Sequence, residues 1–137
     1  MRFLLAIGRW LSVPLLFVVL VLAGTWLSER LVRVLDGYCS PDTQVGGACV
    51  ASWHTTGIEW VVSVGIFVTV LAAILLPSRV APKGQRVVAV IAAVLLVAVP
   101  VGVWLGLRWA DFLLPSAVAL VAAMLGVWRV WKQGERG

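Results

Sequence analysis

Charge is scarce in this 137-residue chain: Asp, Glu, Lys and Arg make up 12% of it, about half of the usual share in a soluble domain. Hydrophobic residues make up 62%. Histidine occurs once, which excludes bis-histidine haem ligation within one chain. The serines near His54 lack a nucleophile elbow or a glycine-rich oxyanion pattern, so no hydrolase triad is indicated. These shortages point away from a soluble enzyme.

The charged residues leave four long blocks free of Asp, Glu, Lys, Arg and His: residues 10–28, 60–78, 87–107 and 112–128. A helix needs about 20 residues to cross the ~30 Å hydrocarbon core, and these blocks have about that length. A backbone in lipid must satisfy its own hydrogen bonds, which favours helices. The sequence therefore predicts an all-α polytopic membrane protein with four transmembrane helices in an antiparallel bundle, forming a single domain over residues 1–137.

The predicted helices have one longer outward loop between the first two, at residues 28–57, whose opening at residues 28–35 could extend the first helix or lie along the membrane interface. We expect the helices at about residues 9–28, 57–77, 86–107 and 111–131.

The first block has a second interpretation, as a secretory signal peptide with residues 1–10 as its basic part. Its uncharged run is longer than the usual apolar region of about 7–15 residues. It also ends in Trp26 and Leu27 rather than in small residues. We therefore expect an uncleaved first helix.

Basic residues are distributed unevenly between the two sides of such a bundle. The N-terminal flank, the connection at residues 77–86 and the C-terminal tail hold eight basic residues and one acid, Glu135. The opposite side holds three arginines and five acids. The positive-inside rule predicts cytoplasmic termini, and cations beside apolar blocks indicate orientation in a membrane rather than nucleic-acid binding. Nine arginines against two lysines, with abundant Ala, Val, Leu and Gly, point to a high-GC bacterial genome and hence a bacterial inner membrane.

All eight tryptophans lie in or near the ends of the blocks. Indole side chains prefer the headgroup layer, so we interpret all of them as interfacial anchors rather than as a ligand cage. They are Trp10, Trp128 and Trp131 on the cytoplasmic side, and Trp26, Trp53, Trp60, Trp104 and Trp109 on the other.

Short motifs suggest how the helices pack. Asp111 has a position suited to capping the fourth helix and pairing with Arg108 in a tight hairpin turn. Gly102 and Gly106 form a GxxxG pair, which permits close approach within the chain or between protomers. The small residues along the fourth helix predict a second packing face; they are Ala119, Ala122, Ala123 and Gly126.

The two cysteines, Cys39 and Cys49, both lie in the long loop. In an oxidising compartment the default is a local disulfide that restricts the loop. A redox-active pair, metal ligation and intermolecular bridging remain alternatives, although the wide spacing differs from the CxxC of reactive thiols.

The end of the loop offers weak functional candidates. Thr56 and Glu59 have the spacing of a capping box, which predicts that the second helix begins at Gly57. An acid at the mouth of a span is also a candidate proton carrier. Three acids, Asp36, Asp42 and Glu59, accompany His54 on the outward side and make a mixed metal site an alternative, but their spacing demands none, and we assign no metal and no cofactor.

Three functions fit this pattern. The first, which we favour, is a non-enzymatic accessory or scaffold subunit that presents the stapled loop to a membrane-protein partner or forms a homo-oligomer. The second is a small transporter or flippase subunit: the chain resembles the small multidrug-resistance transporters in size and helix count, but its first span lacks their acid. The third is a quinone-linked or thiol redox protein: the chain resembles the membrane enzymes that form disulfides in topology alone, without their CxxC and second cysteine pair.

Overall fold

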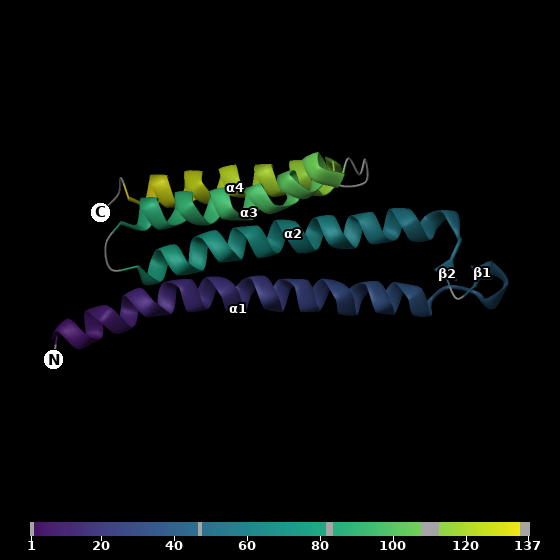
Figure 1. Cartoon of the computed structure of the whole chain (residues 1–137), viewed down its shortest axis with the longest axis horizontal. Coiled ribbons are helices and arrows are strands. Elements are labelled where there is room, and N and C mark those ends of the chain that lie inside the picture. Colours follow the sequence, from purple (N-terminus) through teal and green to yellow (C-terminus); the bar gives the residue numbers. More distant parts are fainter. Residues whose placement is uncertain (1, 47, 82–83, 108–112, 135–137) are drawn as a thin grey trace.

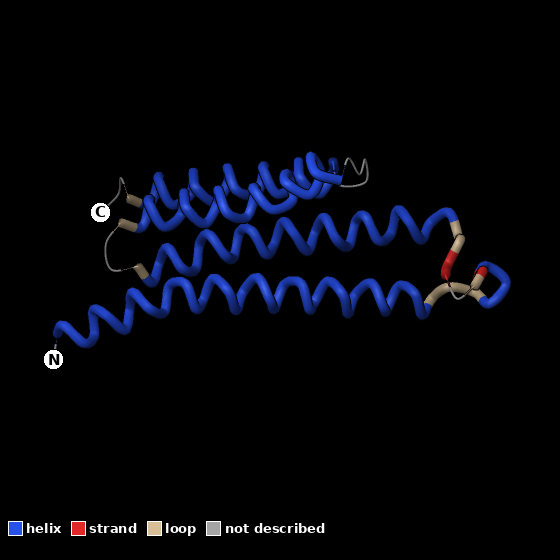
Figure 2. The backbone as a smooth tube through the Cα atoms, in the orientation of Figure 1, coloured by secondary structure: helices blue, strands red, loops and turns tan. Residues whose placement is uncertain are grey.

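The computed structural model describes residues 2–46, 48–81, 84–107 and 113–134. Within these ranges the chain forms four long helices and one small two-stranded hairpin (Figures 1 and 2). The elements are α1 (Arg2–Gly37), a 3-10 turn (Pro41–Thr43), β1 (Gln44–Val45), β2 (Ala48–Cys49), α2 (Ser52–Val80), α3 (Gln85–Leu107) and α4 (Leu113–Gln133). The all-α polytopic fold is confirmed.

Each of the four helices in the described ranges contains a stretch long and apolar enough to cross a membrane. The stretches are Trp10–Gly37, Ser52–Val80, Gln85–Gly102 and Leu113–Gln133. The chain is therefore a multi-pass membrane protein.

The helices differ in length, and this difference shapes the molecule. At 1.5 Å per residue, α1 is about 54 Å long and α2 about 43 Å, against about 32 to 34 Å for α3 and α4. Neighbouring helices run antiparallel, and α1 lies along α2, whose other side faces α3 and α4 (Figure 1). At the end where α1 meets α2, this pair extends well beyond the α3–α4 pair (Figure 1).

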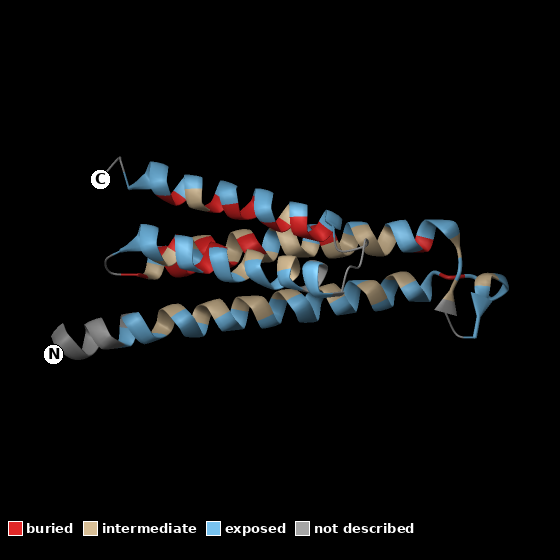
Figure 3. Ribbon diagram, turned by 45° about the horizontal axis from the view of Figure 1, so that its top comes forward, coloured by how far each residue is buried: buried red, intermediate tan, exposed pale blue. Residues whose placement is uncertain are grey.

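The buried side chains concentrate where α2, α3 and α4 meet, while α1 is mostly exposed or half-buried (Figure 3). The predicted small-residue face of α4 lies in this contact, and its Ala119 and Ala122 are fully buried. A β-carbon on Gly126 would lie 3.1 Å from Ile74 Cγ2 of α2. This packing face is therefore used within the chain.

The second small-residue motif is not used in this way. A β-carbon added to Gly102 or to Gly106 would meet no heavy atom within 4 Å in the described part of the chain. Packing of this GxxxG pair between protomers stays a prediction.

Two glycines set the approach of α1 to α2. A β-carbon on Gly24 would lie 2.7 Å from Thr69 Cγ2 and 2.9 Å from Thr69 Cβ. A β-carbon on Gly65 of α2 would collide with the Ser28 hydroxyl of α1. Because small residues allow two backbones to come close, side-chain packing holds these helices together where the surrounding lipid supplies no hydrophobic driving force.

The predicted bounds of the first two helices were wrong. Helix α1 continues to Gly37 instead of residue 28, α2 begins at Ser52 instead of Gly57, and α2 ends at Val80 instead of Pro77. Pro77 lies buried inside the last turns of α2. The absence of charge marks where lipid begins, whereas tertiary packing decides where a helix ends. The bounds of α3 and α4 are within about two residues of those expected.

We predict that Gly24→Ala destabilises the protein, because its methyl group overpacks the contact with Thr69; the expected cost is about 1–3 kcal/mol. Gly102→Ala is the matched control, since open space surrounds that position. Thermal unfolding in mild detergent should show a lower midpoint for Gly24→Ala alone. Equal midpoints for the two variants would contradict the close contact.

Candidate functional site

The part of the α1–α2 pair that extends beyond α3 and α4, together with its connection, is the most elaborated region of the chain. We call residues 29–59 the head. It contains the last two turns of α1, the β-hairpin, both cysteines and the first two turns of α2. Its four acids against two arginines give it a net charge of −2, whereas the whole chain carries +5. The head thus differs from the rest of the chain in both structure and charge.

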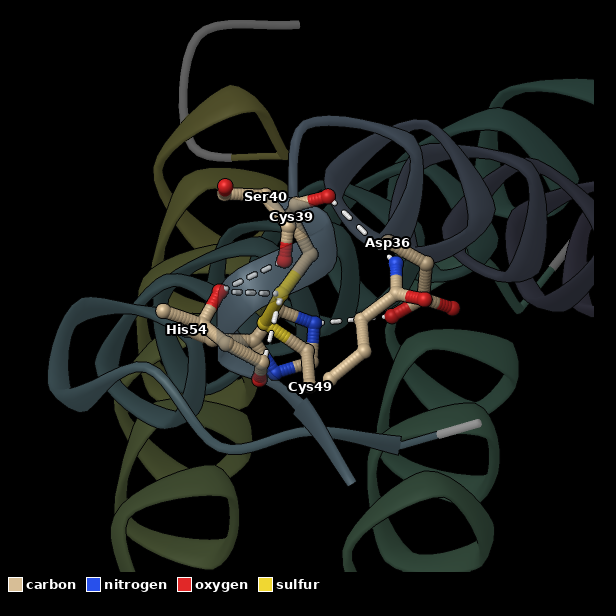
Figure 4. The surroundings of a disulfide bond; sticks show 7 residues. Asp36, Cys39, Ser40, Cys49 and His54 are labelled. Atoms are coloured by element: carbon tan, nitrogen blue, oxygen red, sulfur yellow. Dashed lines mark hydrogen bonds and ion pairs between the residues drawn. A yellow bond between two sulfur atoms is a disulfide. The ribbon is translucent and has the colours of Figure 1, made fainter. Parts of the chain in front are cut away.

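A disulfide joins Cys39 and Cys49, with a Cα–Cα distance of 6.0 Å (Figure 4). Cys39 follows the end of α1 and is 7% exposed, and Cys49 ends β2. Thr43 Oγ1 lies 3.2 Å from the Cys39 sulfur. The predicted disulfide is confirmed, and it ties the end of α1 to the strand that precedes α2.

The two cysteines are ten positions apart, and the segment between them contains the 3-10 turn and the strands β1 and β2. Gln44 pairs with Cys49 and Val45 with Ala48, so a two-residue Gly46-Gly47 connection joins antiparallel strands. Gly46 has a φ of 60°, which only glycine adopts readily and which type I′ hairpin turns require. The Val50 N–H donates to the Thr43 carbonyl at 2.9 Å and extends the pairing. A Gly-Gly pair between short segments is a known hairpin signal, and the sequence interpretation missed it.

A second contact closes the base of the head. His54 Nε2 lies 2.7 Å from Asp36 Oδ1, and the two side chains point toward each other beside the disulfide (Figure 4). A carboxylate can only accept, so Nε2 is the donor when Asp36 is ionised. His54 is buried, and its ring meets the Trp53 indole edge to face at 5.7 Å. With Asp36 partly exposed, we assign the bond a net contribution of about 1 kcal/mol.

The predicted capping box does not start α2. The helix begins at Ser52 with Ala51 at the N-cap, so Thr56 lies in its second turn and Glu59 beyond it. The cause is packing between the two helices. The His54–Asp36 hydrogen bond, together with Leu35 lying beside Gly57, holds one more turn of α2 against α1. Glu59 is half-buried, and its carboxylate makes no hydrogen bond or ion pair with the described residues.

Among the described residues, no three His, Cys, Asp or Glu side chains gather closely enough to hold a metal ion. His54 uses one nitrogen on Asp36, and Asp36 is its one carboxylate partner there.

The tryptophans whose side chains the structure describes are largely exposed on the helix surfaces. Cations cover three of them: Arg30 lies 5.1 Å from Trp26, Arg86 lies 5.2 Å from Trp131, and Lys132 lies 4.8 Å from Trp128. An indole with a neighbouring cation suits a headgroup layer. The anchoring role of this set stays a prediction; its other exposed members are Trp10, Trp53 and Trp60. The Trp104 side chain, Trp109 and the predicted Arg108–Asp111 pair lie outside the described part of the structure.

No protein-family model, curated protein or solved structure matches this chain.

We predict that replacing both cysteines (Cys39→Ser with Cys49→Ser) loosens the head, because the disulfide closes a short loop; the expected cost is about 2–3 kcal/mol. Hydrogen exchange in detergent should speed up at residues 38–54 and stay unchanged in α4. Ser40→Ala is the control, as it is a neighbouring exposed hydroxyl. Unchanged exchange in the double variant would show that the hairpin holds itself.

Proposed function

We propose that the protein is a non-enzymatic accessory or scaffold subunit of a bacterial inner membrane, and that its head docks a partner protein. One observation carries the proposal: between residues 38 and 53, the disulfide-tied head exposes four large apolar side chains among its described residues. Tyr38 is 76% exposed, Val45 66%, Val50 61% and Trp53 46%. Exposed apolar and aromatic groups of this kind are typical of protein interaction surfaces.

The position of these side chains favours a protein over lipid as the covering partner. Trp53 precedes Trp60 by seven residues on α2 and so lies about 10 Å farther along the axis. The headgroup layer extends only about 5–7 Å beyond the hydrocarbon core on each side. If Trp60 anchors α2 in that layer, Trp53 and the hairpin stand beyond the membrane, so this proposal takes Trp53 out of the predicted set of interfacial anchors.

The surroundings of the disulfide favour a structural role over thiol exchange. Exchange requires a thiolate to reach one of the two sulfurs. Cys39 is buried, and Thr43 packs beside its sulfur, whereas Cys49 is half-buried. The burial of the Cys39 side supports the scaffold function, and attack on the Cys49 sulfur is the route that the redox alternative requires.

The orientation forms part of the proposal: both termini in the cytoplasm and the head on the periplasmic or extracellular side. The basic flanks support it. We expect cells lysed in acid, so that thiols are trapped, to yield a chain with both cysteines oxidised, because that side maintains disulfides. Maleimide-dependent gel shifts with and without prior reduction measure this. A chain that is fully labelled without reduction would place the head on the cytoplasmic side.

Docking is tested by affinity purification of the tagged full chain in mild detergent, with mass spectrometry of what co-purifies. We expect one partner in stoichiometric amount, reduced about tenfold by Val45→Asp or Tyr38→Asp, because a charge there costs about 1.4 kcal/mol or more.

Thr55→Asp is the matched control, since it adds the same charge to an exposed polar position of the head. Equal recovery of the partner with all three variants would place the interface elsewhere. A clean homodimer with bound lipid or quinone, and no protein partner, would rule out the subunit function.

A further inference from the structure

An open groove of about 960 Å³ runs between α1 and α3, with α2 as its floor. The groove lies between α1 and α3 because α1 packs against α2 and makes few contacts with α3. Phe17 and Val21 line the α1 wall, Ile66 and Val70 the floor, and Leu95 and Val99 the α3 wall. Most of this surface is apolar.

The groove is about as deep as one leaflet. Phe17 lies near the middle of the charge-free part of α1, and Leu95 near the middle of α3. From Phe17 to Ser28, where that charge-free part ends, the helix rises about 16 Å, close to half of the ~30 Å hydrocarbon core. The groove therefore starts near the bilayer centre and opens toward the head.

The head end of the groove carries one charge of each sign. Glu29 and Arg33 line it, with Oε2 of the acid 3.7 Å from a guanidinium nitrogen. Arg30, between them in sequence, lies against Trp26 and is not part of the lining. The two lining charges sum to zero, and both side chains are largely exposed and free to meet a ligand.

We propose that this groove holds one phospholipid with a zwitterionic phosphoethanolamine headgroup. Its acyl chains lie along the apolar walls, and its headgroup lies across the ion pair with the phosphate at Arg33 and the ammonium at Glu29, whose charged atoms are 3.7 Å apart and so lie at nearly the same depth. Arginine binds phosphate through charge-assisted hydrogen bonds, and a primary ammonium donates such bonds to a carboxylate. An anionic headgroup without an ammonium would leave Glu29 beside a phosphate and is disfavoured.

A transmembrane helix of a second copy fits this groove less well than a lipid does. Such a helix spans the whole core of ~30 Å, whereas the groove covers about half of that depth. The depth of the groove therefore favours a single lipid in one leaflet.

The test measures lipid binding to the purified full chain by native mass spectrometry in detergent, with dioleoyl phosphatidylethanolamine, phosphatidylcholine and phosphatidylglycerol added separately. We expect the ethanolamine lipid to bind tightest. Glu29→Gln and Arg33→Gln should each weaken its binding about two- to fivefold, the range of an exposed ion pair. Both positions are exposed, so these variants leave the fold intact.

Groove filling provides a second arm. Val99→Trp places a large ring at a groove position that is 68% exposed and should weaken binding of the ethanolamine lipid about tenfold or more. Ile91→Trp is the control, on the same helix, 55% exposed and outside the groove lining. Circular dichroism and gel filtration check that both variants are folded.

Three results would overturn the proposal: equal binding of all three lipids regardless of Glu29 and Arg33, tighter binding of the glycerol lipid, or a dimer that Val99→Trp dissociates without displacing lipid. The last would assign the groove to a second copy. Because these measurements use purified protein without a partner, their outcome is independent of whether the head docks one.

Discussion

Gly24 of α1 faces Thr69 of α2, and one turn farther along Gly65 of α2 faces Ser28 of α1. A β-carbon on Gly24 would overlap Thr69, and one on Gly65 would displace the Ser28 hydroxyl, so small residues at both positions let the two backbones come close. The positions of the head and of the groove both depend on this contact. Toward the hairpin it continues into Leu35 against Gly57 and then His54 with Asp36, which carries the head beyond the bundle. The same contact holds α1 against α2 and at a distance from α3, which leaves the groove between α1 and α3.

The sequence predicts some features of the fold and not others. Four charge-free blocks were enough for four helices, because lipid leaves a spanning backbone no other way to satisfy its hydrogen bonds. The ends of α1 and α2 could not be read from hydropathy, which marks apolar stretches rather than helix ends; an extension of the first helix over residues 28–35 was one of two alternatives. What stabilises their outer turns is packing against each other, which involves residues about twenty positions apart. Residues 108–112, where the other hairpin turn was predicted, lie outside the described structure.

Within the head, sequence reasoning found the pieces but not their pairing. Cys39 and Cys49 were the one possible intrachain disulfide, so their bond followed from the count. His54 and Asp36 were noted as members of a loop with four candidate ligands, and 18 positions separate them. A local capping box at Thr56 and Glu59 looked stronger by spacing alone. The structure places Thr56 inside α2 because the helix begins one turn earlier, where the buried His54 makes a hydrogen bond to Asp36 of α1.

The depth of the groove also bears on the choice among functions. A path for moving a substrate across the bilayer must connect its two faces, and flipping a lipid requires passage for its headgroup through the core. The groove ends near the bilayer centre, and its charged pair sits at one end only. A lipid held there would fill the space beside α1 and brace the helix that carries the head. Both the proposed lipid and the proposed partner therefore depend on the contact between α1 and α2. Under the proposed function, the spans would hold the head at a fixed height relative to the membrane.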